Sequence, residues 1–377
     1  MRPSYRKTYA TINLDALEHN VRTLYNYHQK NLIAVIKANA YGHGDIMVAR
    51  HLESLGITMC AVATLDEAIN LRLNGIKMDI LCMGYVEAMD VSLASEHNIT
   101  LTLVSLNWIQ KLQGYQIDGL RVHLKIDTGM NRLGIKEIDQ VYEALELADS
   151  LKCNVEGIYT HFASSDDPMS PQTAKQYESF NTLLESLHRD FKWIHSANSG
   201  AVVNFPTPNC NAVRIGLSLY GYSEYPVDLK PVMTLYASLL DIKSVKAGES
   251  VGYGANYIAS KDELIGTIGI GYADGIHRDI QGYHCSIDGI DCEYVGRICM
   301  DLSLIRLDKK YPIGTLVEIM GDKVNPKDIA TYMGTIVYEL LAQLNGRIPR
   351  IYLQNNEEIA YINPRYPSPT PIYHKAR

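Results

Sequence analysis

The sequence has no pair of cysteines at the C-x-x-C spacing, although it contains 7 cysteines. An odd number of dispersed thiols in a chain of 377 residues favours reduced cysteines and therefore the cytoplasm. The same dispersal argues against a structural zinc site, so we expect no metal. The cysteines are Cys60, Cys82, Cys153, Cys210, Cys285, Cys292 and Cys299.

Long apolar runs and blocks of one charge are also missing. No stretch of about 18 apolar residues occurs, so we expect no membrane-spanning helix. The basic residues near the N-terminus are not followed by an apolar segment, which is unlike a secretory signal. Lys and Arg number 35 and Asp and Glu number 42, which gives a net charge of -7. This mild excess of acid argues against nucleic acid or an anionic membrane as the main partner.

What the sequence does contain is a rhythm of short apolar runs, each followed by a longer segment with helical spacing. Eight such runs precede residue 232. Eight strand-then-helix units predict an α/β fold with a closed (β/α)8 barrel, because an open doubly wound sheet usually needs fewer units. The runs are Leu32–Ile36, Thr58–Ala63, Asp79–Met83, Thr100–Leu103, Arg121–Ile126, Val155–Tyr159, Trp193–His195 and Ala212–Ile215.

After about residue 232 the rhythm changes to strand-like segments separated by turns, which predicts a mainly β domain over residues 233–377. Helices are expected within it near Asn325–Met333 and Ile336–Leu344. Residues 1–10 look like a strand that joins this domain, so the barrel is expected to span 11–232. The strand-like segments are Thr234–Val245, Glu263–Gly269, His284–Ile287 and Met300–Ile305.

Lys37 directly follows the first apolar run, Leu32–Ile36. In a barrel, this places it at the C-terminal end of the first strand, where active sites form. Desolvation lowers the pKa of a lysine and leaves a free amine that can attack a carbonyl group. For this segment alone, a lysine snorkelling at the barrel rim is an equally good interpretation.

Polar residues also follow four other runs of the predicted barrel. A core histidine, a helix cap or a salt-bridged arginine would explain each of them singly, but packing hardly explains polar groups at the same end of many strands. Ser199-Gly200 and Gly216-Leu217 in addition offer backbone N–H groups near loop–helix junctions, a usual setting for a phosphate. The segments are His123–Gly134, Tyr159–His161, His195–Gly200 and Arg214–Leu217.

Several motifs now support one interpretation. The segment Val35–Gly44, which reads VIKANAYGHG, is highly specific, and five further motifs follow it in order. Over nearly the whole chain, apart from the Pro-rich tail, the sequence resembles the alanine racemases, pyridoxal 5'-phosphate enzymes with an N-terminal barrel and a C-terminal β domain. The five further motifs are Ile126–Gly134, Arg214–Leu217, Val251–Ala255, Gly271–Gly275 and Gly296–Asp301.

The resemblance implies an isomerase that interconverts L-alanine and D-alanine through an aldimine with pyridoxal phosphate. Lys37 would carry the cofactor and serve as one base, and Tyr253 would be the other base. Arg214 would face the pyridine nitrogen, Arg132 would contact the phenolic oxygen, and His161 would lie between Tyr253 and Arg214. The phosphate would be held by Tyr41, Ser199, Gly216, Leu217 and Tyr338.

The resemblance also implies how the substrate is held. The backbone N–H of Met300 would bind the substrate carboxylate, with Tyr272 and Arg132 nearby. Lys125 matches a lysine that is carbamylated in some family members, where it steadies the Arg132 side chain. In the family, Lys37 and Tyr253 would meet across a subunit interface, so a homodimer with shared active sites is expected.

Racemisation needs a base on each face of the α carbon, while the cofactor spreads the negative charge left on it. An arginine at the pyridine nitrogen is permanently cationic and cannot accept the ring proton. Arg214 should therefore limit a long-lived carbanion and suppress transamination.

Three alternatives stay open at this stage. A serine or broad-specificity racemase would replace Tyr338 with asparagine in the family pattern. A pyridoxal-phosphate carrier protein would lack the β domain and the motif around Tyr253. A barrel decarboxylase would place an acidic residue where Arg214 stands. The expected physiological role is the supply of D-alanine for peptidoglycan, with a catabolic role as the other possibility.

Overall fold

The computed structural model describes residues 6–365 and the backbone of residues 372–373. The chain divides into two units, one formed by residues 18–230 and the other by the residues up to Leu17 together with those from Pro231 onward. Helix α1 (Leu14–His28) crosses the first boundary between the units.

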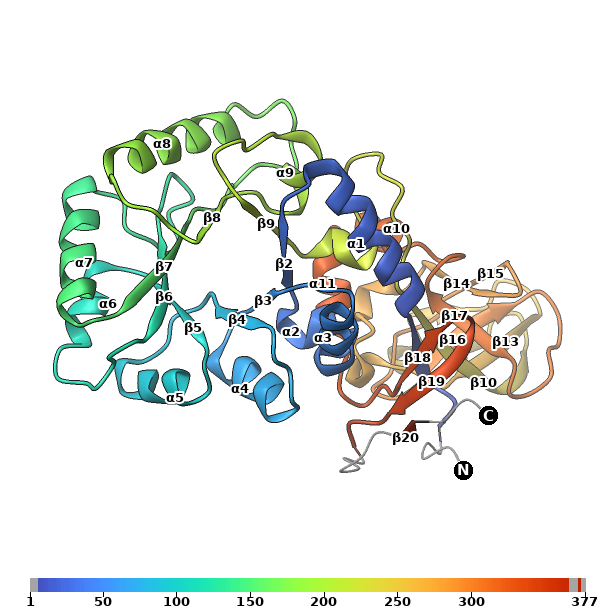
Figure 1. The fold of residues 1–377 in the computed structure, drawn as a ribbon. Coiled ribbons are helices and arrows are strands. Elements are labelled where there is room, and N and C mark those ends of the chain that lie inside the picture. Colours follow the sequence, from blue (N-terminus) through green and yellow to red (C-terminus); the bar gives the residue numbers. More distant parts are fainter. Residues whose placement is uncertain (1–5, 366–371, 374–377) are drawn as a thin grey trace. The chain divides into compact units, whose positions relative to one another are not determined.

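The unit of residues 18–230 is built on a closed barrel of eight parallel strands, in which β9 pairs with β2 (Figure 1). Each apolar run of the sequence overlaps one of these strands, so the predicted barrel is confirmed. The strands are fully buried along most of their length because helices cover their outer face. They are β2 (Asn31–Val35), β3 (Met59–Val62), β4 (Asp79–Cys82), β5 (Thr100–Leu103), β6 (Arg121–Lys125), β7 (Asn154–Tyr159), β8 (Trp193–His195) and β9 (Ala212–Ile215).

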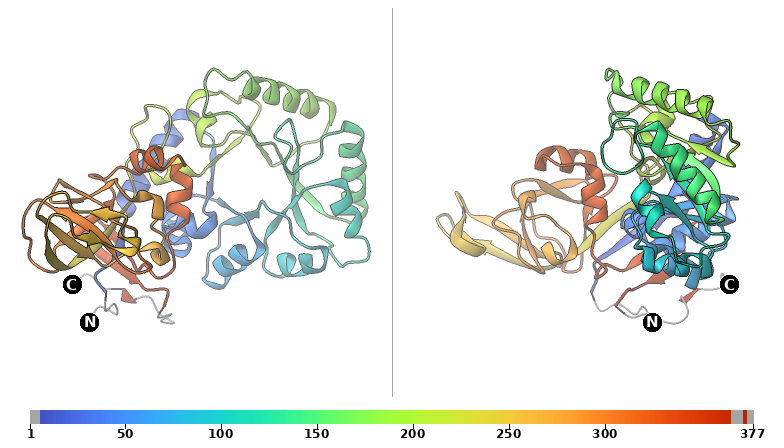
Figure 2. Two further views of the ribbon diagram at one scale, coloured as in Figure 1. Left: turned by 180° about the vertical axis from the view of Figure 1, so that it is seen from behind. Right: turned by 90° about the vertical axis from the view of Figure 1, so that its left-hand side faces the viewer.

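Helices follow the strands and form the outer ring of the barrel (Figure 2). The start of α4 (Leu65–Leu73) is fixed by a capping box: the Thr64 hydroxyl accepts from the Glu67 N–H at 3.2 Å, and the Glu67 carboxylate accepts from the Thr64 N–H. The helices are α2 (Lys37–Tyr41), α3 (Asp45–Ser54), α4 (Leu65–Leu73), α5 (Val91–Glu96), α6 (Leu106–Lys111), α7 (Ile138–Ser150), α8 (Gln172–Ser186) and α9 (Ser199–Asn204), with 3-10 turns at Ala88–Asp90 and Leu217–Tyr220.

The other unit is mainly β, as predicted, and holds a 10-stranded sheet. Strand β10 (Met233–Val245) is long enough to pair with β1 (Tyr9–Asn13), β13 and β17. The remaining elements are β11 (Ser250–Val251), β12 (Tyr257–Ile258), β13 (Glu263–Ile268), β14 (His284–Ile287), β15 (Ile290–Glu293), β16 (Ser303–Leu307), β17 (Leu316–Met320), α10 (Pro326–Met333), α11 (Val337–Ala342), β18 (Arg350–Gln354), β19 (Glu357–Ile362) and β20 (Ile372–Tyr373), with 3-10 turns at Tyr253–Ala255, Tyr272–Asp274 and Arg278–Ile280.

Two strand predictions need correction. The strand expected over residues 1–10 is β1, Tyr9–Asn13, because its alternating buried residues Ala10 and Ile12 lie between β10 and β18; residues 1–5 lie outside the described residues. The strand expected over Met300–Ile305 starts only at Ser303. Residues 300–302, the first three of the predicted segment, instead lie in a turn in which the Cys299 N–H donates to the carbonyl of Leu302 at 3.0 Å.

Among the described residues, no helix has both the length and the apolar character needed to cross a membrane. Within the same residues, His, Cys, Asp and Glu side chains form no group that could hold a metal ion.

Candidate active site

The C-terminal ends of the barrel strands bring together the residues that the sequence singled out in the first unit. Lys37 follows β2, Lys125 ends β6, His161 lies two residues beyond β7, and Arg214 lies in β9. Because the strands are parallel and form one closed barrel, these ends share one face. Ser199 after β8, Gly216 and Leu217 after β9, and Tyr41 in α2 complete the set.

Lys37 begins a turn with unusual backbone geometry. Four non-glycine residues in succession, Ala38 to Tyr41, have φ between 51° and 55°. A left-handed turn costs about 1–2 kcal/mol for each L-residue, so surrounding contacts must hold it. The Glu67 carboxylate accepts from the Ala38 N–H at 2.6 Å, and the Asn39 side chain accepts from the Asp45 N–H at 3.0 Å. The turn fixes the direction in which the chain leaves Lys37.

The surroundings of Lys37 favour its neutral amine. Burial lowers the pKa of the half-buried Lys37 amine, the positive charge of Arg132 lowers it further, and the Glu67 carboxylate opposes both. A neutral lysine is a nucleophile toward a carbonyl group.

Arg214 is a buried cation, 2% exposed. Its Nη1 donates to His195 Nδ1 at 2.6 Å, and its Nη2 donates to His161 Nδ1 at 3.2 Å and to the carbonyl of Thr160 at 2.7 Å. Burial, and then the charge of Arg214, hold the pKa of both histidines well below the usual value. Burial lowers the pKa of Arg214 itself only to about 10, so Arg214 stays charged at neutral pH beside two neutral imidazoles.

Ser199, Gly216 and Tyr41 form a close cluster at the loops after β8, β9 and β2. The Ser199 hydroxyl accepts from the N–H groups of Gly216 at 3.0 Å and of Ser218 at 3.4 Å. A Cβ atom on Gly216 would lie 2.7 Å from the Tyr41 hydroxyl. Converging backbone N–H groups and hydroxyls with a glycine-lined approach are the usual donors for a phosphate group.

Lys125 lies inside the barrel end, where it is 7% exposed. Its Nζ donates to the carbonyl of Ile126 at 3.0 Å and lies 5.1 Å from the ring centre of Tyr159. Burial, followed by the charge of Arg214, lowers the pKa of Lys125 to about 7. Arg132 lies on the exposed loop after β6, which the Asp127 carboxylate shapes by accepting three backbone N–H groups.

Four of the predicted site residues belong to the other unit. The loop of Tyr272 is tied to that of Met300, because the Ala273 N–H donates to the Met300 carbonyl at 2.9 Å and the Tyr272 N–H donates to Cys299 at 3.0 Å. Tyr253 is 70% exposed, Met300 53% and Tyr272 41%, which are high values for large apolar or aromatic side chains. Tyr338 is half-buried on α11.

The predicted site omits two residues that the structure places at its centre, Tyr159 and His195. Their rings stack at 4.7 Å with an angle of 11° between the planes, and the guanidinium of Arg214 lies 5.1 Å from the ring centre of Tyr159. Pairing of Tyr159 with both Lys125 and His195 puts all three on the inner face of the barrel. The alternation of side chains along the strand of Lys125 can be read from the sequence. The register between neighbouring strands, which brings Tyr159 and His195 beside Lys125, cannot.

Family models match both parts of the chain. The family model for the alanine racemase N-terminal domain matches residues 12–224, and the model for the C-terminal domain matches residues 232–352. The chain belongs to the alanine racemase family. These two matches cover the barrel and most of the β unit.

Relatives in the family are similar along almost their whole length. The alanine racemase of Anoxybacillus flavithermus is 41% identical over 379 residues, covering 95% of this chain and 98% of the relative. That of Streptococcus mutans is 38% identical over 362 residues, covering 92% and 97%. The solved alanine racemase of Bacillus anthracis with bound L-Ala-P superposes with a TM-score of 0.92 at 34% identity, covering 96% of this chain and 98% of that one.

Proposed function

We propose that this chain interconverts L-alanine and D-alanine, using pyridoxal 5'-phosphate carried on Lys37. The observation that carries the proposal is the barrel end itself. Neighbouring strand ends there carry a lysine with a lowered pKa, a buried arginine and a cluster of hydrogen-bond donors suited to a phosphate. Membership in the alanine racemase family supports the same reaction.

The residues present are chemically suited to this cofactor. The amine of Lys37 would bind its carbonyl carbon, and the cluster of Tyr41, Ser199, Gly216 and Leu217 would hold its phosphate, with Tyr338 from the other unit. When bound, the cofactor supplies a conjugated ring that takes up the negative charge left by loss of the α proton. Arg132 would contact the phenolic oxygen of the ring.

Arg214 would face the pyridine nitrogen. Its side chain has hydrogen-bond donors only, and the carbonyls and imidazoles around it hold it in one orientation. A fixed cation without a lone pair cannot take a proton from the ring nitrogen or act as an acid-base partner there. This favours return of a proton to the α carbon over transamination, and it separates the chain from decarboxylases with an acidic residue at this place.

Two side chains would move the α proton, one for each face of the substrate. Lys37 would serve one face and Tyr253 the other, with His161 between Tyr253 and Arg214. Tyr253 is largely exposed within its own unit, as expected for a group that works against another surface. We propose that this surface is the barrel end of a second copy, so that the active site is shared within a homodimer.

The substrate carboxylate would be bound by the backbone N–H of Met300, with Tyr272 and Arg132 nearby. The tie between the Tyr272 and Met300 loops supports a joint role. Tyr338 stands where serine-adapted relatives have asparagine, which favours the small methyl side chain of alanine.

Lys125 would be carbamylated. Its pKa of about 7 leaves much of the amine neutral at neutral pH, and a neutral amine can add to carbon dioxide with loss of one proton. The carbamate would replace a buried cation by an anion that pairs with Arg132.

We further assign cofactor binding to residues 11–232 and the second base to residues 233–377. The same reaction in the cytoplasm would supply D-alanine for peptidoglycan. All 7 cysteines are free, six of them buried, which supports a reducing compartment.

The direct test is incubation with L-alanine and the cofactor in heavy water, followed by measurement of α-deuteration and optical rotation. We expect both to change with alanine and much less with L-serine. Lys37→Ala should lose the bound-cofactor absorbance and the activity, whereas Lys175→Ala, on the exposed face of α8, should keep both. Absence of exchange with alanine in the unaltered protein would contradict the proposal.

A further inference from the structure

The polar contacts inside the barrel continue beyond Arg214. His195 on β8 accepts from Arg214 at Nδ1, and its other nitrogen, Nε2, lies 3.0 Å from Nδ1 of His123 on β6. Both rings are fully buried. Barrel interiors are usually filled by branched apolar side chains, and burying polar groups costs free energy unless they are paired. Two adjoining buried histidines therefore call for a role beyond packing.

The chemistry of arginine sets the protons on both rings. Because Arg214 can only donate, Nδ1 of His195 must be the acceptor, and the proton of this neutral ring lies on Nε2. His195 then donates to Nδ1 of His123, which leaves the proton of His123 on its own Nε2. That N–H faces Oε1 of Glu156 at 3.9 Å, an electrostatic contact rather than a hydrogen bond.

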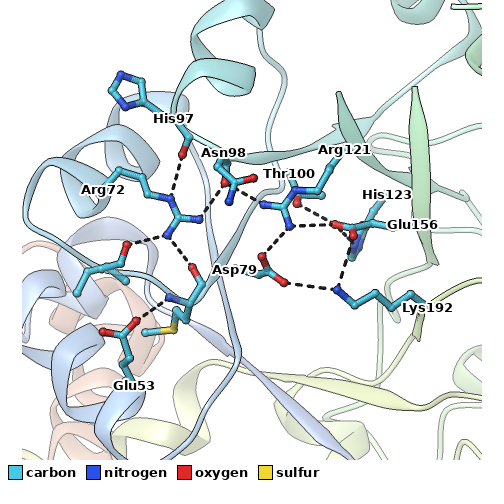
Figure 3. A network of polar contacts seen from close by, with 12 residues as sticks. Glu53, Arg72, Asp79, His97, Asn98, Thr100, Arg121, His123, Glu156 and Lys192 are labelled. Atoms are coloured by element: carbon cyan, nitrogen blue, oxygen red, sulfur yellow. Dashed lines mark hydrogen bonds and ion pairs between the residues drawn. The ribbon is translucent and has the colours of Figure 1, made fainter. Parts of the chain in front are cut away.

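Glu156 reaches the barrel interior through a β-bulge. Val122 pairs with Val155 and His123 pairs with Gly157, so Glu156 is the unpaired extra residue of β7. Figure 3 shows its carboxylate among polar groups at the N-terminal ends of the barrel strands, away from Lys37. Thr100 donates to this carboxylate at 3.0 Å. Arg121 and Lys192 lie at 3.7 Å and 3.8 Å, and Asp79 pairs with the same two cations.

The backbone beside His123 is shaped for this ring. A Cβ atom on Gly157 would lie 2.6 Å from Cγ of His123, so only glycine leaves room for the imidazole. Glu156 and Gly157 therefore act on the same ring: the Glu156 carboxylate places a negative charge near it, and Gly157 leaves room for it. Among the described residues, Arg214 forms no ion pair with a carboxylate, although it is a buried cation.

We propose that Glu156 positions His123, and that His123 and His195, each held in a single tautomer, present a fixed acceptor to Arg214. The three are positioning residues: they contact neither cofactor nor substrate, and they act by keeping a strong acceptor in front of the Arg214 guanidinium. The relay formed by Glu156, His123 and His195 holds Arg214 in position and does not conduct protons, because Arg214 has no lone pair that could accept one. The importance of this relay for racemisation rests on the proposed function, but its hydrogen-bonding arrangement does not.

The test is nitrogen NMR of the full-length protein labelled with ¹⁵N in the histidine rings, with the cofactor bound and after its removal. We expect His195 and His123 each to carry their proton on Nε2 alone in both states. Glu156→Gln keeps the shape and an acceptor for Thr100 but removes the charge. It should shift the ring signals of His195 and lower kcat/KM for alanine by about tenfold, because Arg214 would be positioned less well.

A double-mutant cycle separates the relay from general damage. In the background of His123→Leu, which breaks the chain, Glu156→Gln should no longer shift His195. His123→Asn, which keeps an oxygen acceptor beside His195 Nε2, should retain the His195 tautomer and more activity than His123→Leu. Asp118→Asn is the control, because it removes a carboxylate from an exposed pair with Lys152 and, among the described residues, Asp118 makes no ion pair with His123.

The proposal would be overturned by a proton on Nδ1 of His195, or by His195 ring signals that do not shift in Glu156→Gln. Either result would count against it even if the protein were a fully active racemase. Expected NMR shifts without any alanine exchange would leave the relay standing and contradict the proposed function instead.

Discussion

The hydroxyl of Tyr41 occupies the space that a side chain on Gly216 would need, since a Cβ atom there would lie 2.7 Å from it. Tyr41 ends the left-handed turn after Lys37, and Gly216 follows the last barrel strand. The first and last strand ends of the barrel therefore meet at this contact, beside the Ser199 hydroxyl that accepts from the Gly216 N–H. Any change there acts on the proposed phosphate site and on the turn of Lys37 together.

Gly216→Ala should weaken cofactor binding by about tenfold, or roughly 1.4 kcal/mol, by displacing the Tyr41 hydroxyl. The φ of Gly216 is -118°, so the effect comes from lack of space and not from left-handed strain. Fluorescence titration of the cofactor-free protein would measure it. Gly346→Ala, whose Cβ would meet only Pro364 at 3.8 Å, should bind as before. Equal affinities for both variants would contradict this account of the site.

Tyr253→Phe should lower racemisation by about 10²- to 10⁴-fold, because one of two proton-transferring groups is lost. Since the two enantiomers are equally stable, kcat/KM must fall equally in both directions. The asymmetry should instead appear in heavy water, where the variant exchanges the α-hydrogen of one enantiomer faster than it inverts it. Equal and small losses of exchange with both enantiomers would rule out the two-base assignment. Tyr257→Phe, on a nearby strand of the same unit, serves as control.

Lys125 should make stability depend on pH in a defined window. Its pKa is about 7 in the folded chain against 10.5 for an unperturbed lysine. Between these values the unfolded chain binds the extra proton, so the free energy of unfolding should rise with pH from about 7 to about 10.5, by a few kcal/mol in order of magnitude. Lys125→Met removes this contribution, and Lys175→Met does not.

Urea unfolding of the cofactor-free protein in carbonate-free buffer, over this pH range, would measure the difference between Lys125→Met and the unaltered chain. Parallel curves would show that the Lys125 amine is not desolvated. Mass spectrometry of the native protein after addition of bicarbonate would test the carbamate separately, as a gain that the Met variant lacks.

Arg214→Lys should destabilise the cofactor-free protein by about 2–4 kcal/mol. The shorter ammonium cannot reach the imidazoles of His195 and His161 and the surrounding carbonyls at once, and buried acceptors would lose their donors. Arg189→Lys, at an exposed pair with Asp149, should cost less than about 1 kcal/mol. A similar urea midpoint for both variants would show that the contacts of Arg214 are not cooperative.

Much of the barrel was predictable because each of its strands is a local feature. An apolar run of about five residues next to a helical segment indicates a parallel strand wherever it occurs. The β unit was less predictable: strands β15, β17, β18 and β19 are short or half-exposed, and two of their pairings, β17 with β10 and β18 with β1, join segments far apart in the sequence. The left-handed turn after Lys37 has no sequence signal either, since Ala38 and Ala40 ordinarily favour a right-handed helix.

The sequence by itself determined which chemical groups exist and at which strand ends they lie: Lys37, Lys125 and Arg214 could be named from motif and position alone. Only the tertiary structure decided their state. The acceptors around Arg214 and the histidine pair beside them come from residues 18 to 72 positions apart in the chain. Desolvation of Lys125 and the bulge that turns Glu156 toward His123 likewise depend on the pairing of different strands. The physical reason is that pKa values, tautomers and free space depend on which groups the fold brings into contact, whereas residue type and strand pattern are local properties of the sequence.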